Sequence, residues 1–193
     1  MIRFVLCYNC LMSYVSRAGE KLEYALTVFN FSPQGLVCAD FGSSTGGFVD
    51  CLLQHGAKKV YAVETGYGTV DYKLRTNPRL VLMERTNAMH VLLPEKVDFI
   101  SIDTSWTRLE HVLPNALKNL LPGGHIIALV KPHYEADQKM LRKSRLSDES
   151  IPEVLEGVKN KVSNIGLEIV GETESPIVGK KGKNREFLLF LKS

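Results

Sequence analysis

The sequence predicts an α/β fold in which a mostly parallel, seven-stranded sheet is covered by helices on both faces and ends in an antiparallel hairpin. Apolar segments of strand length alternate with amphipathic segments of helix length along the chain, which is typical of parallel sheets. The last two strand-like segments are separated by a loop alone, so we expect them to pair antiparallel. The chain has 193 residues, 45% of them apolar, which suits one such domain and is too few for two.

Seven segments have the length and the apolar, β-branched composition of buried strands. They are residues 36–41, 59–64, 80–83, 97–102, 125–130, 167–172 and 185–191. The fifth of these is the most apolar.

Five segments have apolar residues at helical spacing. They are residues 17–29, 46–55, 70–75, 107–121 and 151–165. Ser16 is the candidate N-cap of the first helix. We expect Pro122-Gly123-Gly124 to end the fourth helix, and the polar residues 132–147 to form a loop.

Composition excludes several classes of protein. The net charge of +3 permits an anionic partner without requiring one. No apolar stretch approaches the roughly 20 residues that span a bilayer, and the N-terminus is a poor signal peptide, so we expect a cytoplasmic protein with no membrane partner. Cys7 and Cys10 have the spacing of half a zinc site, but nothing completes it, so we expect reduced thiols and no metal. We see no internal repeat, and we expect a mobile extension over residues 1–13 before one domain over 14–193.

A glycine-rich segment lies where the first strand is followed by a helix, the place where open α/β sheets bind ligands. Its glycines, Gly42, Gly46 and Gly47, allow a tight turn and close approach to a ligand. Their spacing is neither that of a dinucleotide-binding motif nor that of a P-loop. Asp40, at the strand end, would repel a pyrophosphate but suits a ligand with a cationic amino-acid end, such as S-adenosylmethionine.

The next strands support the same ligand. Glu64 closes the second strand, where a carboxylate can accept hydrogen bonds from both hydroxyls of a ribose. Asn87 and Asp103 lie at the expected carboxyl ends of the following two strands. The predicted contacts of S-adenosylmethionine are Asp40, Gly42, Ser44, Thr45, Gly46, Gly47, Phe48, Glu64, Asn87 and Asp103.

Several stretches together make a more specific pattern. They are residues 14–22, 40–48, 66–68, 84–88, 129–132 and 175–188. In these stretches the chain resembles the TlyA family of haemolysin-A-like enzymes, which are related to the FtsJ-type ribose 2′-O-methyltransferases. The resemblance implies a Rossmann-like fold dependent on S-adenosylmethionine, and methyl transfer to a ribose 2′-hydroxyl of RNA, with ribosomal RNA or a ribosomal subunit as the expected partner. The S4 RNA-binding module common in that family is not recognisable here.

The catalytic Lys-Asp-Lys-Glu pattern of that family falls on Lys21, Asp103, Lys131 and Glu186. A ribose hydroxyl must lose its proton while it attacks the methyl group. An ammonium group stabilises the developing alkoxide, and a neutral amine could accept the proton. We therefore expect Lys131 to activate the hydroxyl. Asp103, Lys21 and Glu186 are expected to orient both Lys131 and the 2′-hydroxyl.

Two basic clusters flank this expected site and could contact phosphates. They are Lys139, Arg142, Lys143 and Arg145, and Lys180, Lys181, Lys183 and Arg185. Two alternatives stay open: a methyltransferase acting on a small molecule, and a non-catalytic RNA-binding protein of the same fold. A membrane-lytic function has no support, because the amphipathic helices have core-facing patterns. The sequence carries no signal for the oligomeric state.

Overall fold

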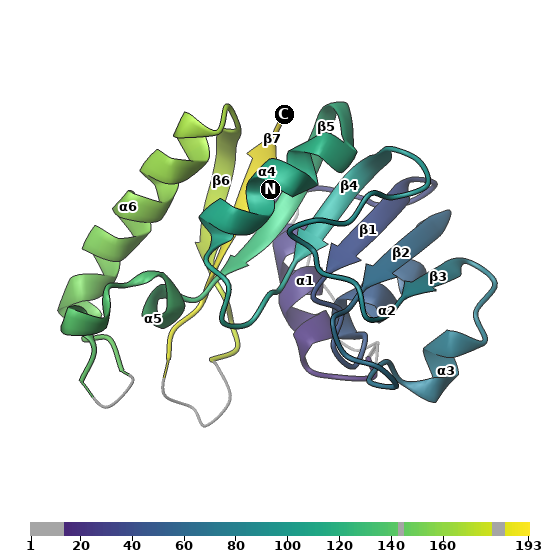
Figure 1. Ribbon diagram of the computed structural model, residues 1–193, viewed down its shortest axis with the longest axis horizontal. Helices are drawn as coiled ribbons and strands as arrows, with labels where there is room; N and C mark the ends of the chain where they lie inside the picture. The colour runs from purple at the N-terminus through teal and green to yellow at the C-terminus, as the bar shows by residue number, and fades with distance from the viewer. Residues whose placement is uncertain (1–13, 143–144, 179–183) are drawn as a thin grey trace, which may run out of the picture.

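The computed structural model describes residues 14–142, 145–178 and 184–193, and in it a single seven-stranded sheet forms the centre of the molecule (Figure 1). The strands are β1 (Val37–Phe41), β2 (Lys59–Val63), β3 (Leu80–Met83), β4 (Val97–Ile102), β5 (Leu120–Val130), β6 (Glu168–Glu174) and β7 (Phe187–Lys192). The helices are α1 (Ala18–Val28), α2 (Gly47–Gln54), α3 (Tyr72–Arg75), α4 (Leu109–Asn119), α5 (Pro132–Glu135) and α6 (Ile151–Asn164). The predicted fold class is confirmed.

The strand order is β3-β2-β1-β4-β5-β7-β6. Strands β1 to β5 are parallel, and β7 runs antiparallel to both β5 and β6. The chain moves outward from β1 to β3 and then crosses back to β4, so the strand order reverses between β1 and β4. In sheets of this kind the carboxyl ends of the two strands at such a reversal border a ligand crevice.

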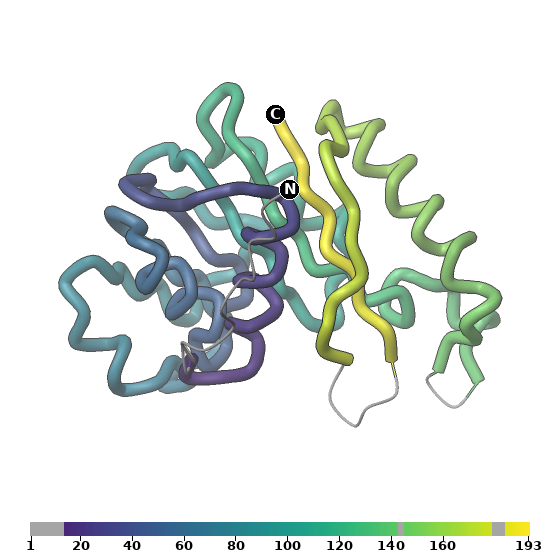
Figure 2. The backbone as a smooth tube through the Cα atoms, turned by 180° about the vertical axis from the view of Figure 1, so that it is seen from behind, coloured from purple at the N-terminus to yellow at the C-terminus, as the bar shows by residue number. Residues whose placement is uncertain are grey.

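Helices cover both faces of the sheet, and each face has its own apolar core. On one face α4 and α6 pack over side chains such as Phe41, Ile100 and Leu189. On the other, seen from behind in Figure 2, α1 and α2 pack over side chains such as Phe99 and Leu188. Neighbouring residues of β7 alternate between the two cores, as the period of a strand requires. Burial on both faces explains the continuous apolar runs in the sequence.

Several predicted boundaries were wrong. Residues 122–124 do not end a helix: α4 stops at Asn119, Leu120 is already extended, and the turn at Gly123 lies within β5, where the pairing with β4 shifts register. Residues 132–147 are not only loop, because Pro132 starts the short helix α5 and the 3₁₀ turn Gln138–Met140 follows.

The start of the first helix also differs from the prediction. Its N-cap is Arg17 rather than Ser16, and no side chain caps it. The carbonyl oxygen of Ser16 instead accepts a hydrogen bond from the N–H of Gly19 at 3.0 Å. The predicted extension over residues 1–13 lies outside the described residues. Within the described ranges, no helix is both long enough and apolar enough to cross a membrane.

Candidate active site

The loop between β1 and α2 lies at the reversal of strand order. Gly42 has φ +92°, and a Cβ there would lie 2.7 Å from the carbonyl oxygen of Asp103, so only glycine lets the ends of β1 and β4 come this close. A Cβ on Gly47 would lie 2.3 Å from the hydroxyl oxygen of Ser16. The two glycines therefore hold the loop against β4 on one side and the start of α1 on the other.

Two cavities, of about 400 and 300 Å³, adjoin this loop. Gly42, Ser44, Asp103 and Ser105 line both of them. Between them the cavities form one elongated crevice at the carboxyl edge of the sheet.

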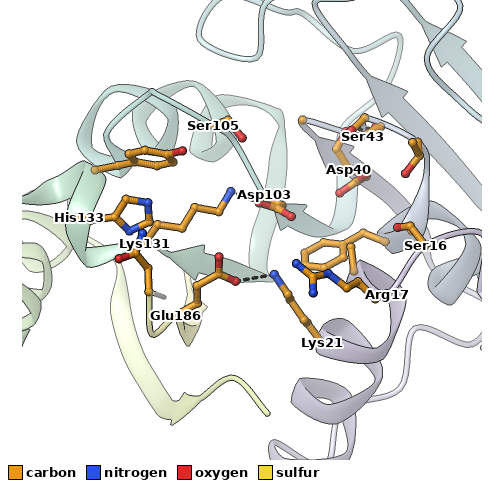
Figure 3. A pocket seen from close by; sticks show the side chains of 18 residues that line it. Ser16, Arg17, Lys21, Asp40, Ser43, Asp103, Ser105, Lys131, His133 and Glu186 are labelled. Atoms are coloured by element: carbon orange, nitrogen blue, oxygen red, sulfur yellow. Dashed lines mark hydrogen bonds and ion pairs between the residues drawn. The ribbon is translucent and has the colours of Figure 1, made fainter. Parts of the chain in front are cut away.

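Asp40 is the buried anion of the first cavity (Figure 3). Its side chain is inaccessible to solvent, and its Oδ1 accepts a hydrogen bond from the hydroxyl of Ser101 at 2.7 Å. Its Oδ2 has no partner among the described residues. Burial raises the pKa of Asp40 to about 7. A cationic ligand group beside Oδ2 would relieve this unfavourable burial.

Glu64 lines the second cavity, and its carboxylate shapes the loop. Its Oε2 accepts the N–H of Ser44 and its Oε1 the N–H of Gly66, both at 2.7 Å. Oε1 also accepts a hydrogen bond from the hydroxyl of Thr65 at 3.1 Å, so the capacity that remains for a ribose hydroxyl lies mainly at Oε2. Asn87 lines the same cavity, while its Oδ1 accepts the N–H of Met89 at 2.9 Å.

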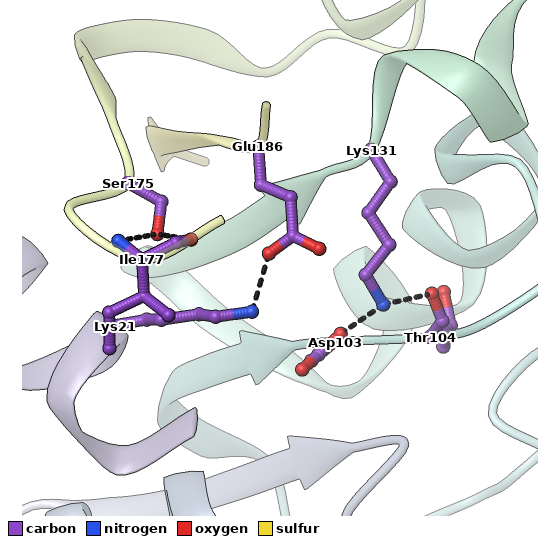
Figure 4. A network of polar contacts seen from close by, with 7 residues as sticks. All are labelled: Lys21, Asp103, Thr104, Lys131, Ser175, Ile177 and Glu186. Carbon is purple, nitrogen blue, oxygen red and sulfur yellow. Dashed lines mark hydrogen bonds and ion pairs between the residues drawn. The ribbon is translucent and has the colours of Figure 1, made fainter. Parts of the chain in front are cut away.

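The structure brings together the four residues predicted to be catalytic, all of which line the first cavity (Figure 4). Lys21, on α1, forms an ion pair with Glu186, which immediately precedes β7, and both are buried. Lys131, at the end of β5, forms an ion pair with Asp103, at the end of β4. Its Nζ also donates to the carbonyl oxygen of Thr104 at 3.3 Å. The site thus contains two ammonium–carboxylate pairs rather than four independent groups.

The predicted cofactor residues of the glycine loop divide into two groups. Ser44, Thr45, Gly47 and Phe48 line the first cavity. Gly46 is not among the residues that line either cavity. It has φ +96°, and a Cβ there would lie 2.4 Å from Leu74, so its requirement for glycine is explained by backbone conformation and packing.

The sequence analysis missed an aromatic pair beside the ion pairs. The Trp106 side chain is 84% exposed, and its ring centroid lies 5.0 Å from that of Tyr134. Trp106 follows Asp103 by three positions, and Tyr134 follows Lys131 by three. This equal spacing is the feature of the sequence that could have indicated the pair. His133 also lines the first cavity, and burial together with the charge of Lys131 lowers its pKa.

The basic clusters are only partly described. Lys139 is 3.7 Å from Asp137, and Arg142 pairs through its backbone with Arg145. Arg185 binds Glu174 through two hydrogen bonds, at 2.7 and 2.6 Å. The other four lysines, at positions 143, 180, 181 and 183, lie outside the described residues.

Comparison with known proteins matches residues 14–193 to the model of the FtsJ-like methyltransferase family. Hemolysin A of Brachyspira hyodysenteriae is 38% identical over 183 residues, covering 92% of this chain and 76% of that protein. The 16S/23S rRNA (cytidine-2′-O)-methyltransferase TlyA of Mycobacterium tuberculosis is 35% identical over 191 residues, covering 94% of this chain and 69% of that one.

Solved structures agree with this match. A hemolysin-like structure from Streptococcus thermophilus superposes with a TM-score of 0.91 at 40% identity, over 96% of this chain and 69% of that chain. An S-adenosylmethionine-dependent methyltransferase from Mesorhizobium loti has the same fold, with a TM-score of 0.65 at 15% identity over 88% of this chain and 96% of that one. The resemblance seen in the sequence is confirmed, and the chain belongs to the FtsJ-like methyltransferase family.

Proposed function

We propose that the protein transfers a methyl group from S-adenosylmethionine to a ribose 2′-hydroxyl of ribosomal RNA. The observation that carries this proposal is the pairing of Lys131 with Asp103 and of Lys21 with Glu186 around one cavity that also contains the buried Asp40. Relatives named as rRNA 2′-O-methyltransferases over most of this chain support the choice of substrate.

The crevice fits S-adenosylmethionine. The unpartnered Oδ2 of Asp40 suits the ammonium group of the methionine end, because a buried carboxylate without a partner is costly. Glu64 and Asn87 line the second cavity, where they suit the adenosine end. When bound, the cofactor supplies an electrophilic methyl group on a sulfonium centre.

Lys131 has the geometry to act on a hydroxyl. An ammonium group has three N–H donors, and two of them are taken by Asp103 and the carbonyl oxygen of Thr104. The third can donate to the ribose oxygen and stabilise negative charge that develops there. In its neutral form the same amine could accept the hydroxyl proton. Asp103 therefore orients Lys131, and Glu186 orients Lys21.

The aromatic pair favours a nucleotide as the acceptor. RNA bases outside a helix are commonly bound by stacking on aromatic side chains. Trp106 and Tyr134 follow the two members of one ion pair, so a base stacked there would place its ribose near Lys131. Lys139 and Arg142, farther along the same segment, are suited to phosphates of the same strand. This substrate also implies a cytoplasmic location, where ribosomes are found.

The test is methyl transfer from radiolabelled S-adenosylmethionine to ribosomal subunits, to protein-free rRNA and to a panel of small hydroxyl compounds. We expect label in RNA, at a site that resists alkaline cleavage because its 2′-oxygen is blocked. Lys59→Ala is a matched control, since Lys59 forms an ion pair with Glu95 at 2.7 Å at the amino end of β2, at the edge of the sheet opposite the cavity. Label in small acceptors but not in RNA would refute the proposed substrate, and binding of RNA without any transfer would refute catalysis.

A further inference from the structure

We infer that Glu135 is a positioning residue for the Lys131–Asp103 pair, acting by tying the turn after Lys131 to the start of α4. Of the two measurements that test this inference, only the measurement of methyl transfer rests on the proposed function. Glu135 lies outside the set of paired acids and bases, and it contacts backbone rather than a reacting group.

Two segments lie side by side at this edge of the sheet: residues 103–109, which follow β4, and residues 131–137, which follow β5. Their contacts run in nearly matching order. Lys131 pairs with Asp103, and the ring of Tyr134 contacts that of Trp106. Farther along, Arg108 donates to the carbonyl oxygen of Ala136 at 3.2 Å. The two segments therefore hold one another in place.

Glu135 makes the contact that fixes the far end of this pairing. Its Oε1 accepts the N–H of Leu109, the first residue of α4, at 2.8 Å. The N-cap residue of α4, Arg108, makes no side-chain cap of its own, so Glu135 supplies an acceptor that the helix start otherwise lacks. A carboxylate at a helix N-terminus also interacts favourably with the helix dipole.

The surroundings of Glu135 make burial of its carboxylate unfavourable unless the contact with α4 compensates for it. Its Oε2 is buried and has no partner among the described residues. Burial is the main cause that raises the pKa of Glu135, while the N–H of Leu109 opposes the rise. A side chain serving only solubility would turn outward into water. Here the carboxylate is retained in a poorly solvated position where it reaches α4.

The tie is transmitted to Lys131 through a single helical turn. Lys131 is the N-cap of α5, and its carbonyl oxygen accepts the N–H groups of Tyr134 at 2.8 Å and of Glu135 at 3.3 Å. Between Asp103 and α4 the chain has no regular structure, and Trp106 has φ +65°, a conformation that is unfavourable for its side chain. Without Glu135 we expect residues 104–108 to relax and Asp103 to lose its fixed position beside Lys131.

Two conservative variants separate reach from charge. Glu135→Gln keeps an oxygen at the same distance and loses the charge, whereas Glu135→Asp keeps the charge but is one methylene too short to reach Leu109. Glu110→Ala is the matched control for charge at this helix start, because Glu110 lies in the first turn of the same helix and pairs with Lys161 at 3.0 Å and with Arg108 at 3.8 Å rather than with the N–H of Leu109. All of these variants leave Asp40 and Glu64 unchanged, so S-adenosylmethionine should still bind.

We expect Glu135→Asp and Glu135→Ala to lower kcat by about tenfold to a hundredfold, the scale of a small misplacement of reacting groups. Glu135→Gln and Glu110→Ala should stay within about threefold of the parent protein, since neither disturbs the contact with Leu109. A positioning role thus predicts that Gln restores turnover and Asp does not. If Asp is active and Gln is not, or if Glu110→Ala loses as much turnover as Glu135→Ala, the inference is wrong.

A second readout needs no substrate. Trp106 is the only tryptophan of the chain, so the fast phase of its fluorescence anisotropy decay reports on local motion around residue 106, while the slow phase follows the tumbling of the whole protein. We expect faster local motion in Glu135→Asp than in Glu135→Gln, and equal motion would overturn the inference. If the parent protein did not methylate RNA, the proposed function would fail while this measurement still decided the role of Glu135.

Discussion

Replacing Asp40 with asparagine should stabilise the ligand-free protein while abolishing tight binding of S-adenosylmethionine. Asp40 is fully buried, and one of its two carboxylate oxygens has no partner among the described residues. An asparagine at this position can still accept the hydrogen bond from Ser101 through its amide oxygen. The substitution therefore removes a buried charge and keeps the hydrogen bond from Ser101.

The magnitude follows from the pKa of Asp40. The difference between its ordinary value of 3.8 and about 7 corresponds to about 4 kcal/mol of unfavourable burial of the charge above pH 7. Asparagine leaves an amide donor facing the crevice, which costs about 1–3 kcal/mol if it finds no partner. We expect Asp40→Asn to raise the free energy of unfolding at pH 8 by about 1–3 kcal/mol, the balance of these two contributions.

The pH dependence has a definite sign. Because the folded-state pKa is raised, the folded protein holds the Asp40 proton more tightly than the unfolded chain does. The free energy of unfolding of the parent protein should therefore fall, relative to Asp40→Asn, as pH rises from about 4 to about 7, and level off above that range. Other titrating groups are the same in both proteins, so the difference between them isolates Asp40.

Urea unfolding of both proteins at pH 5 and pH 8, without ligand, measures this difference. Asp50→Asn is the control, because both oxygens of buried Asp50 already accept hydrogen bonds, from Val15 at 2.8 Å and from Gln54 at 2.9 Å. That variant should be less stable than the parent. If Asp40→Asn is no more stable than the parent at pH 8, or the difference does not change with pH, the account of Asp40 is wrong. Calorimetry should also show that the parent binds S-adenosylmethionine more weakly below pH 7, as Asp40 becomes protonated.

Three further substitutions test separate parts of the structure. Lys131→Ala should lower methyl transfer by more than about a hundredfold and leave cofactor affinity within about twofold, whereas activity within tenfold of the parent would exclude the proposed role. Gly47→Ala should lower the free energy of unfolding by about 1–3 kcal/mol, because the added methyl group would clash with the start of α1. Gly157→Ala, in open space on α6, should instead raise that free energy by up to about 1 kcal/mol, and thermal unfolding that ranks the two variants otherwise would contradict the packing. Replacing Lys139 and Arg142 with alanine should weaken RNA binding and reduce the slope of log affinity against log salt by about 1–2, with an unchanged slope as the contrary result.

The ends of the buried strands could be predicted from the sequence, and with them most of the site. Parallel strands that follow one another through helices must place their carboxyl ends at one edge, so Asp40, Asp103 and Lys131 were bound to lie near one another. The positions of Lys21 and Glu186 came from the resemblance to a known family. Their pairing into one buried ion pair became visible only in three dimensions.

The contacts between loops could not be predicted, because they depend on the path of the chain between regular elements. The polar segment after Lys131 carries no periodic signal, and the four-residue helix α5 is too short to produce one. The contacts of Tyr134 with Trp106 and of Glu135 with Leu109 depend on that helix. Gly46 was predicted to contact the cofactor but lines neither cavity. A glycine required by backbone conformation and one required by a ligand look alike in a sequence.

Asp40 and Glu135 have different roles at the carboxyl edge of this sheet. Asp40 is unfavourably buried in the ligand cavity, whereas Glu135 holds in place the segment beside that cavity. Each has one buried carboxylate oxygen that lacks a partner among the described residues, and burial raises the pKa of both. Asp40 opens into the cavity, so a cationic ligand can satisfy it, and its unfavourable burial favours binding. Glu135 instead accepts a hydrogen bond at the start of α4. That contact orders the segment that carries Asp103, which offsets the free-energy cost of burying the Glu135 carboxylate. Bound S-adenosylmethionine should therefore suppress the part of the pH dependence of stability that comes from Asp40. It should leave the part that comes from Glu135 unchanged.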